Sequence, residues 1–237
     1  MACARADIRG KMTGARLAAT LTVLMFVAYG NATAAVRAGT VKQFIGRATA
    51  ASPDGEIRAL RRGSPIFSEE VLTTGPNSFL RVKYTDGAYM MLRPNTRFLI
   101  EKYVHTKKPE ENRGFFSLLK GGLRTVTGLI GRLRKKNFRL TTAVATIGIR
   151  GTDFDTRVCD GDCLDVDPPP ADGLYVGLNH NKGIVVVNAG GTLELRTAGT
   201  YGYSAGPNQP IVEVSPQFAL PLTQNPIPPA DPQMCPQ

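Results

Sequence analysis

Turn-forming residues recur about every 8 to 12 positions through most of this chain, and this spacing restricts the fold more than any other feature. Before residue 103, turns are predicted at 50–55, 61–65, 73–77, 85–88 and 93–96. The segments between them are short and apolar or alternating, as where Leu80, Val82 and Tyr84 share one face. The pattern predicts an all-β sandwich or roll of short antiparallel strands.

The C-terminal third continues this pattern. Strands are predicted at 174–178, 184–188 and 192–195, in two hairpin-like units with glycine turns, and His180 falls in the first turn. No long linker precedes these strands, so we expect a single β domain over 35–215 whose C-terminal extension is 172–215. Residues 216–237 are rich in proline and almost uncharged, and we expect a disordered tail there.

The N-terminus has the parts of a secretory signal peptide. Four basic residues precede an apolar run at 17–29, and Ala32-Thr33-Ala34 forms a small-x-small cleavage site. The run is shorter than the roughly 20 residues that span a bilayer. We therefore expect a signal peptide over 1–34, and a mature protein that is periplasmic or secreted and not integral to the membrane. A retained anchor is the alternative.

An exported protein meets an oxidising environment, in which cysteines can form disulfides. The segment Cys159-Asp160-Gly161-Asp162-Cys163 is expected to close a small disulfide loop in an oxidising compartment, with Gly161 easing the turn. Two thiolates without a nearby His make a poor zinc site, and the acids there lack the spacing of a calcium loop. No metal and no cofactor are predicted. Cys235 has no assigned partner.

Residues 141–157 form a predicted strand in which Gly148 and Gly151 stand on either side of Arg150. Glycine in a strand suggests a bulge or a close backbone approach. Arg150 then either caps carbonyls or pairs with Asp153 or Asp155, or it grips a ligand. We favour the structural role.

Positive charge is concentrated between residues 113 and 139, which include eight Lys or Arg and no acidic residue. Apolar residues at 126, 129, 130 and 133 have helical spacing, so this crossover is a short helix or a flexible loop. The predicted binding residues are Arg124, Arg132, Arg134, Lys135, Lys136 and Arg139. Such a patch suits an anionic polymer or glycan of the cell envelope. A solvated basic loop is the plainer alternative.

Other partners and activities fit less well. Export and the scarcity of aromatic residues in the patch argue against nucleic acid. A G-x-S-x-G motif is absent. Asp153 and Asp155 would lie on one face of a strand, about 7 Å apart, like a glycosidase pair. Solvent-facing acids show the same spacing, so we predict a protein that is not an enzyme, with an envelope polysaccharide hydrolase as an alternative.

A series of motifs over 36–157 resembles the FecR-type periplasmic domain. The motifs are Thr74-Gly75, Asp86-Gly87, Leu92-x-Pro94, Leu119-x-Gly121 with Leu123-Arg124, and Arg150-Gly151-Thr152-x-Phe154. The resemblance marks Gly75, Asp86, Gly87, Gly121, Arg150, Gly151, Thr152 and Phe154 as structural motif residues.

That family includes membrane regulators of surface signalling, whose periplasmic part receives a signal from an outer-membrane receptor and whose cytoplasmic segment controls a sigma factor. This sequence shows no such segment before the apolar run, so the resemblance implies a stand-alone exported form. We expect a binding or sensing domain that engages a protein partner or an anionic envelope component, in signalling or assembly.

Overall fold

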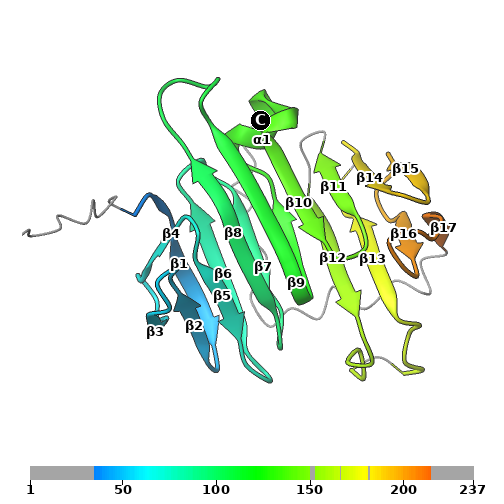
Figure 1. The fold of residues 1–237 in the computed structure, drawn as a ribbon, viewed down its shortest axis with the longest axis horizontal. Coiled ribbons are helices and arrows are strands. Elements are labelled where there is room, and N and C mark those ends of the chain that lie inside the picture. Colours follow the sequence, from blue (N-terminus) through cyan, green and yellow to red (C-terminus); the bar gives the residue numbers. More distant parts are fainter. Residues whose placement is uncertain (1–34, 150–152, 166, 181, 215–237) are drawn as a thin grey trace, which may run out of the picture. The chain divides into compact units, whose positions relative to one another are not determined.

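A computed structural model describes residues 35–149, 153–165, 167–180 and 182–214. Residues 1–34 separate as a unit of their own, and the description that follows concerns the unit that begins at Ala35. Strands dominate this unit, and the fold class predicted from the turn spacing, all-β with mostly antiparallel strands, is confirmed (Figure 1).

The strands lie in two layers. The first layer has the order β4 (Pro65–Phe67), β1 (Arg37–Ile45), β6 (Phe79–Tyr84), β7 (Tyr89–Leu92), β9 (Arg113–Val126), β12 (Asp153–Cys159), β13 (Gly173–Leu178), β16 (Tyr201–Ser204) and β17 (Val212–Val214). The second has the order β3 (Ile57–Ala59), β2 (Ala48–Ala51), β5 (Val71–Thr74), β8 (Arg97–Val104), β9, β10 (Phe138–Thr142), β11 (Thr146–Ile149), β14 (Ile184–Asn188) and β15 (Gly191–Leu195). Because β9 belongs to both layers, hydrogen bonds join all these strands into one open sheet.

An aromatic core fills the space between the layers. Tyr84 of the first layer lies 5.3 Å from Tyr103 of the second, measured between ring centroids, and 5.4 Å from Phe116. Phe138 of the second layer meets Phe154 of the first edge-on at 6.5 Å. All five rings are buried, so aromatic contacts hold the two layers face to face.

Strand β9 folds over between the layers. Its first half pairs with β8, where Gly114 lies opposite Tyr103, and its second half pairs with β7, where Val126 lies opposite Tyr89. The Tyr103 hydroxyl accepts a hydrogen bond of 3.0 Å from the backbone N–H of Asp86, in the turn just before β7. Both ends of β9 therefore lie at the same end of the sheet, and the strand reverses direction between them.

The reversal is clamped at Gly121 and Gly122. Gly121 has a φ of +80°, and a Cβ there would come within 2.6 Å of Thr96 Oγ1 and 2.8 Å of the carbonyl oxygen of Asn95. The Thr96 hydroxyl donates to the carbonyl of Gly122 at 2.9 Å and accepts from the N–H of Gly122 at 3.1 Å. One side chain from the β7–β8 turn thus satisfies both backbone groups at the bend.

The crossover between β9 and β10 contains the short helix α1 (Leu129–Leu133) and the 3₁₀ turn η1 (Lys135–Asn137). Strands β9 and β10 are parallel, with Gly114 opposite Phe138, whereas the other pairings of the described residues are antiparallel. A parallel pair needs a long connection between its strands, and this basic crossover provides it. Of the two forms left open for the crossover, a short helix is therefore observed.

The C-terminal third differs from the predicted hairpins. Of the three predicted strands, β14 and β15 form a hairpin, whereas β13 pairs with β12 and β16 in the first layer and β14 also pairs with β11 in the second. The segment around His180 therefore connects the layers and is not a hairpin turn. Strand β13 is buried along its whole length, which suits an inner strand of a layer.

Replacing Gly121 with alanine should lower the free energy of unfolding by at least about 2 kcal/mol, because alanine must take a positive φ and its Cβ would meet Thr96. Gly63→Ala is the matched control, since Gly63 has a φ of +88° but no atom within 4 Å of a built Cβ. Denaturant unfolding of both variants measures the difference. Equal losses in the two variants would show that the clamp does not constrain the bend.

Candidate functional site

Asp86 anchors the basic crossover. The backbone N–H groups of Leu129 and Ile130 donate to the carbonyl oxygen and to Oδ2 of Asp86, at 3.0 and 3.2 Å. The other carboxylate oxygen accepts from the Tyr103 hydroxyl at 3.1 Å. Asp86 stands in the predicted turn with Gly87, whose φ is +87°. Besides forming that turn, it caps the start of α1 from 44 residues away, which no local sequence signal indicates.

The six predicted binding residues do not form one site. Arg124 lies in the second half of β9, where its guanidinium binds Asp153 through two hydrogen bonds of 2.8 and 2.6 Å. Arg139 lies over the ring of Phe115 at 4.5 Å and contacts Glu101 at 3.3 Å. The remaining four, Arg132, Arg134, Lys135 and Lys136, are exposed on or beside α1 and form no ion pair with the described residues.

A shallow concavity lies beside these cations. Its volume is about 460 Å³. It is lined by Lys135, Lys136, Phe138, Arg139, Thr146, Gly148, Ile149 and Val185. Part of the predicted patch thus does border a hollow, whereas Arg124 does not.

A larger cleft, of about 570 Å³, lies at the other end of the strands. Its lining residues are Pro76, Asn77, Arg93, Pro94, Asn95, Gly121, Gly122, Arg157, Gly161, Asp162, Leu164 and Asp165. They come from the turn after β5, the β7–β8 turn, the bend of β9, strand β12 and the loop that follows it. Figure 1 shows α1 at the upper end of the strands and the connection after β12 at the lower end. The sequence did not indicate this cleft, because its walls come from turns far apart along the chain.

Family-like residues hold together the turns that line the cleft. The backbone N–H of Asn95 donates to the carbonyl of Gly75 at 3.1 Å, and the N–H of Thr96 donates to the Thr74 hydroxyl at 2.9 Å. These bonds fasten the turn after β5 to the β7–β8 turn, which in turn holds Gly122. Gly75 and Gly121 therefore lie where these turns are joined to one another and to the bend of β9.

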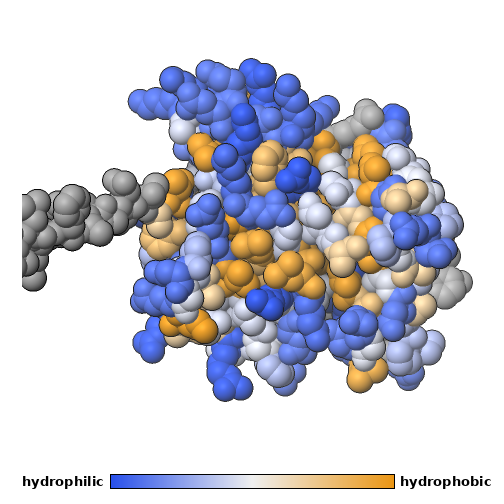
Figure 2. Space-filling view, in the orientation of Figure 1, coloured by the Kyte–Doolittle hydropathy of each residue, from blue (hydrophilic) through white to orange (hydrophobic). Residues whose placement is uncertain are grey.

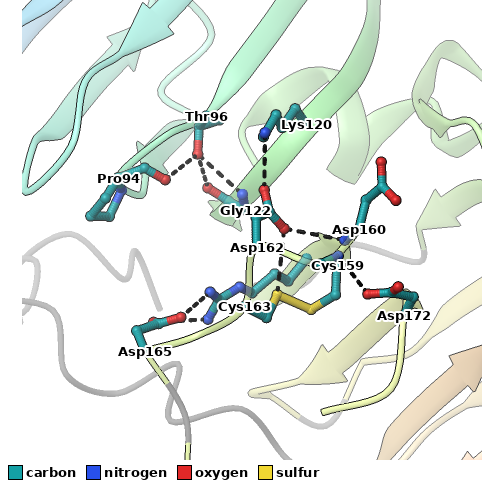
Figure 3. A network of polar contacts seen from close by, with 12 residues as sticks. Pro94, Thr96, Lys120, Gly122, Cys159, Asp160, Asp162, Cys163, Asp165 and Asp172 are labelled. Carbon is teal, nitrogen blue, oxygen red and sulfur yellow. Dashed lines mark hydrogen bonds and ion pairs between the residues drawn. A yellow bond between two sulfur atoms is a disulfide. The ribbon is translucent and has the colours of Figure 1, made fainter. Parts of the chain in front are cut away.

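A disulfide loop forms one wall, which confirms the predicted bond between Cys159 and Cys163. Asp162 reaches from this loop to Lys120 on β9, with 3.3 Å between Oδ2 and Nζ (Figure 3). The N–H of Gly161, whose φ is +65°, donates to Asp172 at 2.7 Å. The disulfide also packs against Tyr175, so the wall is fastened on both of its sides.

Charges in the cleft are balanced. Arg157 is buried on β12 and binds the carboxylate of Asp165 through two hydrogen bonds, one of them 3.1 Å long. This guanidinium holds the pKa of Asp165 below its ordinary value. Arg93 is half-buried, and desolvation lowers its pKa while Asp155 and Asp165 oppose that shift. The cleft thus offers fixed cations whose charge is already compensated.

Asp153 and Asp155 share one face of β12, as predicted, but they do not form an open catalytic pair. Asp153 is bound by Arg124, and the amide of Asn179 donates to both carboxylates, at 3.3 Å to Asp153. Asp155 is only 2% exposed, and burial raises its pKa to about 6. A glycosidase acid and nucleophile must both reach the sugar, and this geometry does not allow that.

The other predicted motif residues fall in different places. Arg150, Gly151 and Thr152 lie outside the described residues, whereas Phe154 is fully buried in the core. Among the described residues, no three His, Cys, Asp or Glu side chains are placed to hold a metal ion. No helix of the described part has the length and hydropathy needed to cross a bilayer.

Comparison with known families gives a match for the central segment of the chain. Residues 70–165 match the family described as "FecR protein". The chain contains a FecR domain. The match starts later than the resemblance at 36–157, since it begins just before β5, and it ends in the loop after the disulfide. It covers β5 to β12, and therefore includes the bend of β9 and its clamp.

Comparisons over whole chains add little to the FecR domain. Two crystal structures of a "putative anti-sigma factor" from Parabacteroides distasonis match at a TM-score of 0.45 and 13% identity, over 61% of this chain and 59% of that one. A "cell surface anchoring domain" matches at a TM-score of 0.25 and 26% identity, over 26% of this chain and 80% of that one. These values are too low to assign a fold or an activity. A comparison with curated proteins found no significant match.

Asp155 should make stability depend on pH. Its pKa is raised from 3.8 to about 6, so the carboxyl group stays protonated to a higher pH in the folded state than in the unfolded state. The protonated form therefore stabilises the fold, and this stabilisation is lost as pH rises. The free energy of unfolding of the wild type, relative to Asp155→Asn, should fall by about 3 kcal/mol between pH 3 and pH 7 and then level off.

Denaturant unfolding of both proteins across that range measures the effect. Asp54→Asn is the control, because Asp54 is exposed and a hydrogen bond from Ser52 lowers its pKa, so any effect should have the opposite sign. A constant difference between the wild type and Asp155→Asn would show that Asp155 ionises normally.

Proposed function

We propose that the protein is an exported, non-catalytic binding domain that engages a protein partner in signalling or assembly at the cell envelope. One observation carries this proposal: all twelve residues that line the large cleft fall between 76 and 165, within the FecR match. The smaller concavity is lined partly by Val185, which lies outside the match. The cleft is therefore the binding site that belongs to the FecR domain itself.

The chemistry of the cleft suits a protein segment. Leu164 is 75% exposed and directly follows Cys163 of the disulfide loop, so a partner can bury it at little cost in conformational entropy. Around it lie backbone groups of two turns and a compensated ion pair, Arg157 with Asp165. An apolar anchor with polar surroundings is typical of protein interfaces.

The same lining argues against catalysis. Its carboxylates, Asp162 and Asp165, are each paired with a cation, and among the described lining residues there is no His, Ser or free Cys. A general acid or base would need a titratable group aimed into the cleft. Binding, without turnover, is the function that these residues support.

Export is supported by two features. The N-terminal residues 1–34 carry the charge, apolar run and small residues of a signal peptide. The bond between Cys159 and Cys163 is of a kind that persists in oxidising compartments such as the periplasm. We therefore place the partner in the periplasm or outside the cell.

Site-specific photo-crosslinking of the full chain in cells tests the proposal. A benzophenone amino acid at position 164 should give a discrete adduct with a protein, because Leu164 stands at the rim of the cleft. The same group at position 57 is the matched control, since Ile57 is 70% exposed on the edge strand β3 and should give none. Once the partner is identified, Leu164→Asp should weaken its binding by about tenfold or more at an unchanged melting temperature.

Other outcomes would reject the proposal. No adduct from position 164, or the same adducts from both positions, would show that the cleft holds no protein partner. If the protein instead binds a glycan or another polyanion through 113–139, the group at position 164 should give no adduct, and binding should depend on the cations near α1.

A further inference from the structure

Two leucines are exposed side by side on α1. Leu129 and Leu133 are 48% and 63% exposed, and residues four apart share one face of a helix. Between them, Ile130 is 2% exposed and points into the core. The helical spacing of the apolar residues therefore serves two faces: one fixes the helix to the sheet, and the other presents leucines to the outside.

Cations surround these leucines. Arg132, Arg134, Lys135 and Lys136 are exposed, and the described residues provide none of them with an ion-pair partner. We call residues 129–136 the α1 tip. Its eight residues contain two exposed leucines, four cations and no acid.

The α1 tip is rigidly placed at one end of the molecule. Asp86 binds the first N–H groups of the helix, and a Cβ on Gly128 would lie 2.4 Å from the Asp86 carboxylate, so the helix sits close against the β6–β7 turn. The side chain of Asn137 donates to the carbonyl of Asn112 at 2.8 Å and fastens the other side. Figure 1 places α1 at the upper end of the strands. Figure 2, in the same orientation, shows hydrophilic residues gathered at that end.

We infer that the α1 tip docks on the surface of an anionic lipid bilayer. Leucines on a short helix enter the boundary between headgroups and acyl chains, while lysines and arginines beside them attract anionic headgroups. A membrane surface uses both features of the tip at once. A soluble polyanion would use only the cations and would leave both leucines in water.

This inference goes beyond the proposed function. The α1 tip and the cleft share no residue, since no cleft residue falls between 123 and 156. They lie at opposite ends of the strands, so a membrane-bound domain can present its cleft away from the lipid. Either proposal can fail while the other holds.

Co-sedimentation of the full chain with vesicles tests the inference. The protein should bind vesicles of phosphatidylcholine with about one-third phosphatidylglycerol, and should not bind vesicles of phosphatidylcholine alone. Leu129→Ser with Leu133→Ser, and separately Lys135→Glu with Lys136→Glu, should each weaken binding by about tenfold or more.

Matched controls separate the tip from surface properties in general. Arg61→Glu with Arg62→Glu makes the same change of charge in the exposed β3–β4 turn, and Ile57→Ser with Val212→Ser removes two exposed apolar side chains elsewhere. Both control pairs should bind like the wild type. If the leucine variant binds normally while the lysine variant does not, the tip is a site for soluble polyanions and the inference is wrong. If neither variant loses binding, it is also wrong.

A second measurement does not depend on loss of function. The chain has no tryptophan, so Leu133→Trp provides a single reporter on the tip. Its fluorescence should shift to shorter wavelength with the anionic vesicles and be quenched by brominated lipid. An unchanged spectrum with the anionic vesicles would overturn the inference, even if the protein sediments with them.

Discussion

The bend of β9 is held by bonds from the β7–β8 turn, where the N–H of Arg93 and the hydroxyl of Thr96 both reach Gly122. Thr96 accepts the N–H of Gly122 and donates to its carbonyl, at the point where Gly121 adopts a positive φ and the strand passes between layers. Without that bend the two layers would share no strand, and the parallel pair with β10 would lose its partner. The same turn carries Arg93, Pro94 and Asn95 into the cleft, so a structural clamp also shapes the candidate binding site.

The family-like residues serve as scaffolding at both ends of the strands. Gly75 and Gly121 bring turns together beneath the cleft, and Asp86 fixes the helix that carries the α1 tip. None of the three offers a side chain to a ligand. The two surfaces that we propose for binding, around Leu164 and around Leu133, belong to the loop and the crossover that these residues hold, as is usual for sites built on a rigid frame.

Local patterns predicted local structure well. Turn spacing led to the all-β fold and the cysteine spacing to the disulfide, and of the two forms that the apolar spacing at 126–133 allowed, the short helix is observed. Pairing between distant segments was not predictable, because period-2 alternation does not specify a neighbour. For the same reason Arg124 was grouped with the exposed cations, although Asp153, 29 residues further on, binds it. The buried strand β13 likewise resembled half of a hairpin until its partners were known.

Positive charge is distributed unequally over the molecule. Near the cleft, Arg157 is held by Asp165 and Lys120 lies against Asp162, so little net charge is left there to select a partner. On the α1 tip four cations stand close together without an acid among them, and their field extends about a Debye length into solution. Under the two proposals, long-range attraction would orient the molecule by its α1 end, and short-range packing around Leu164 would select the partner of the cleft. In such a domain one surface, the α1 tip, would set the orientation, and a separate surface, the cleft, would set the choice of partner.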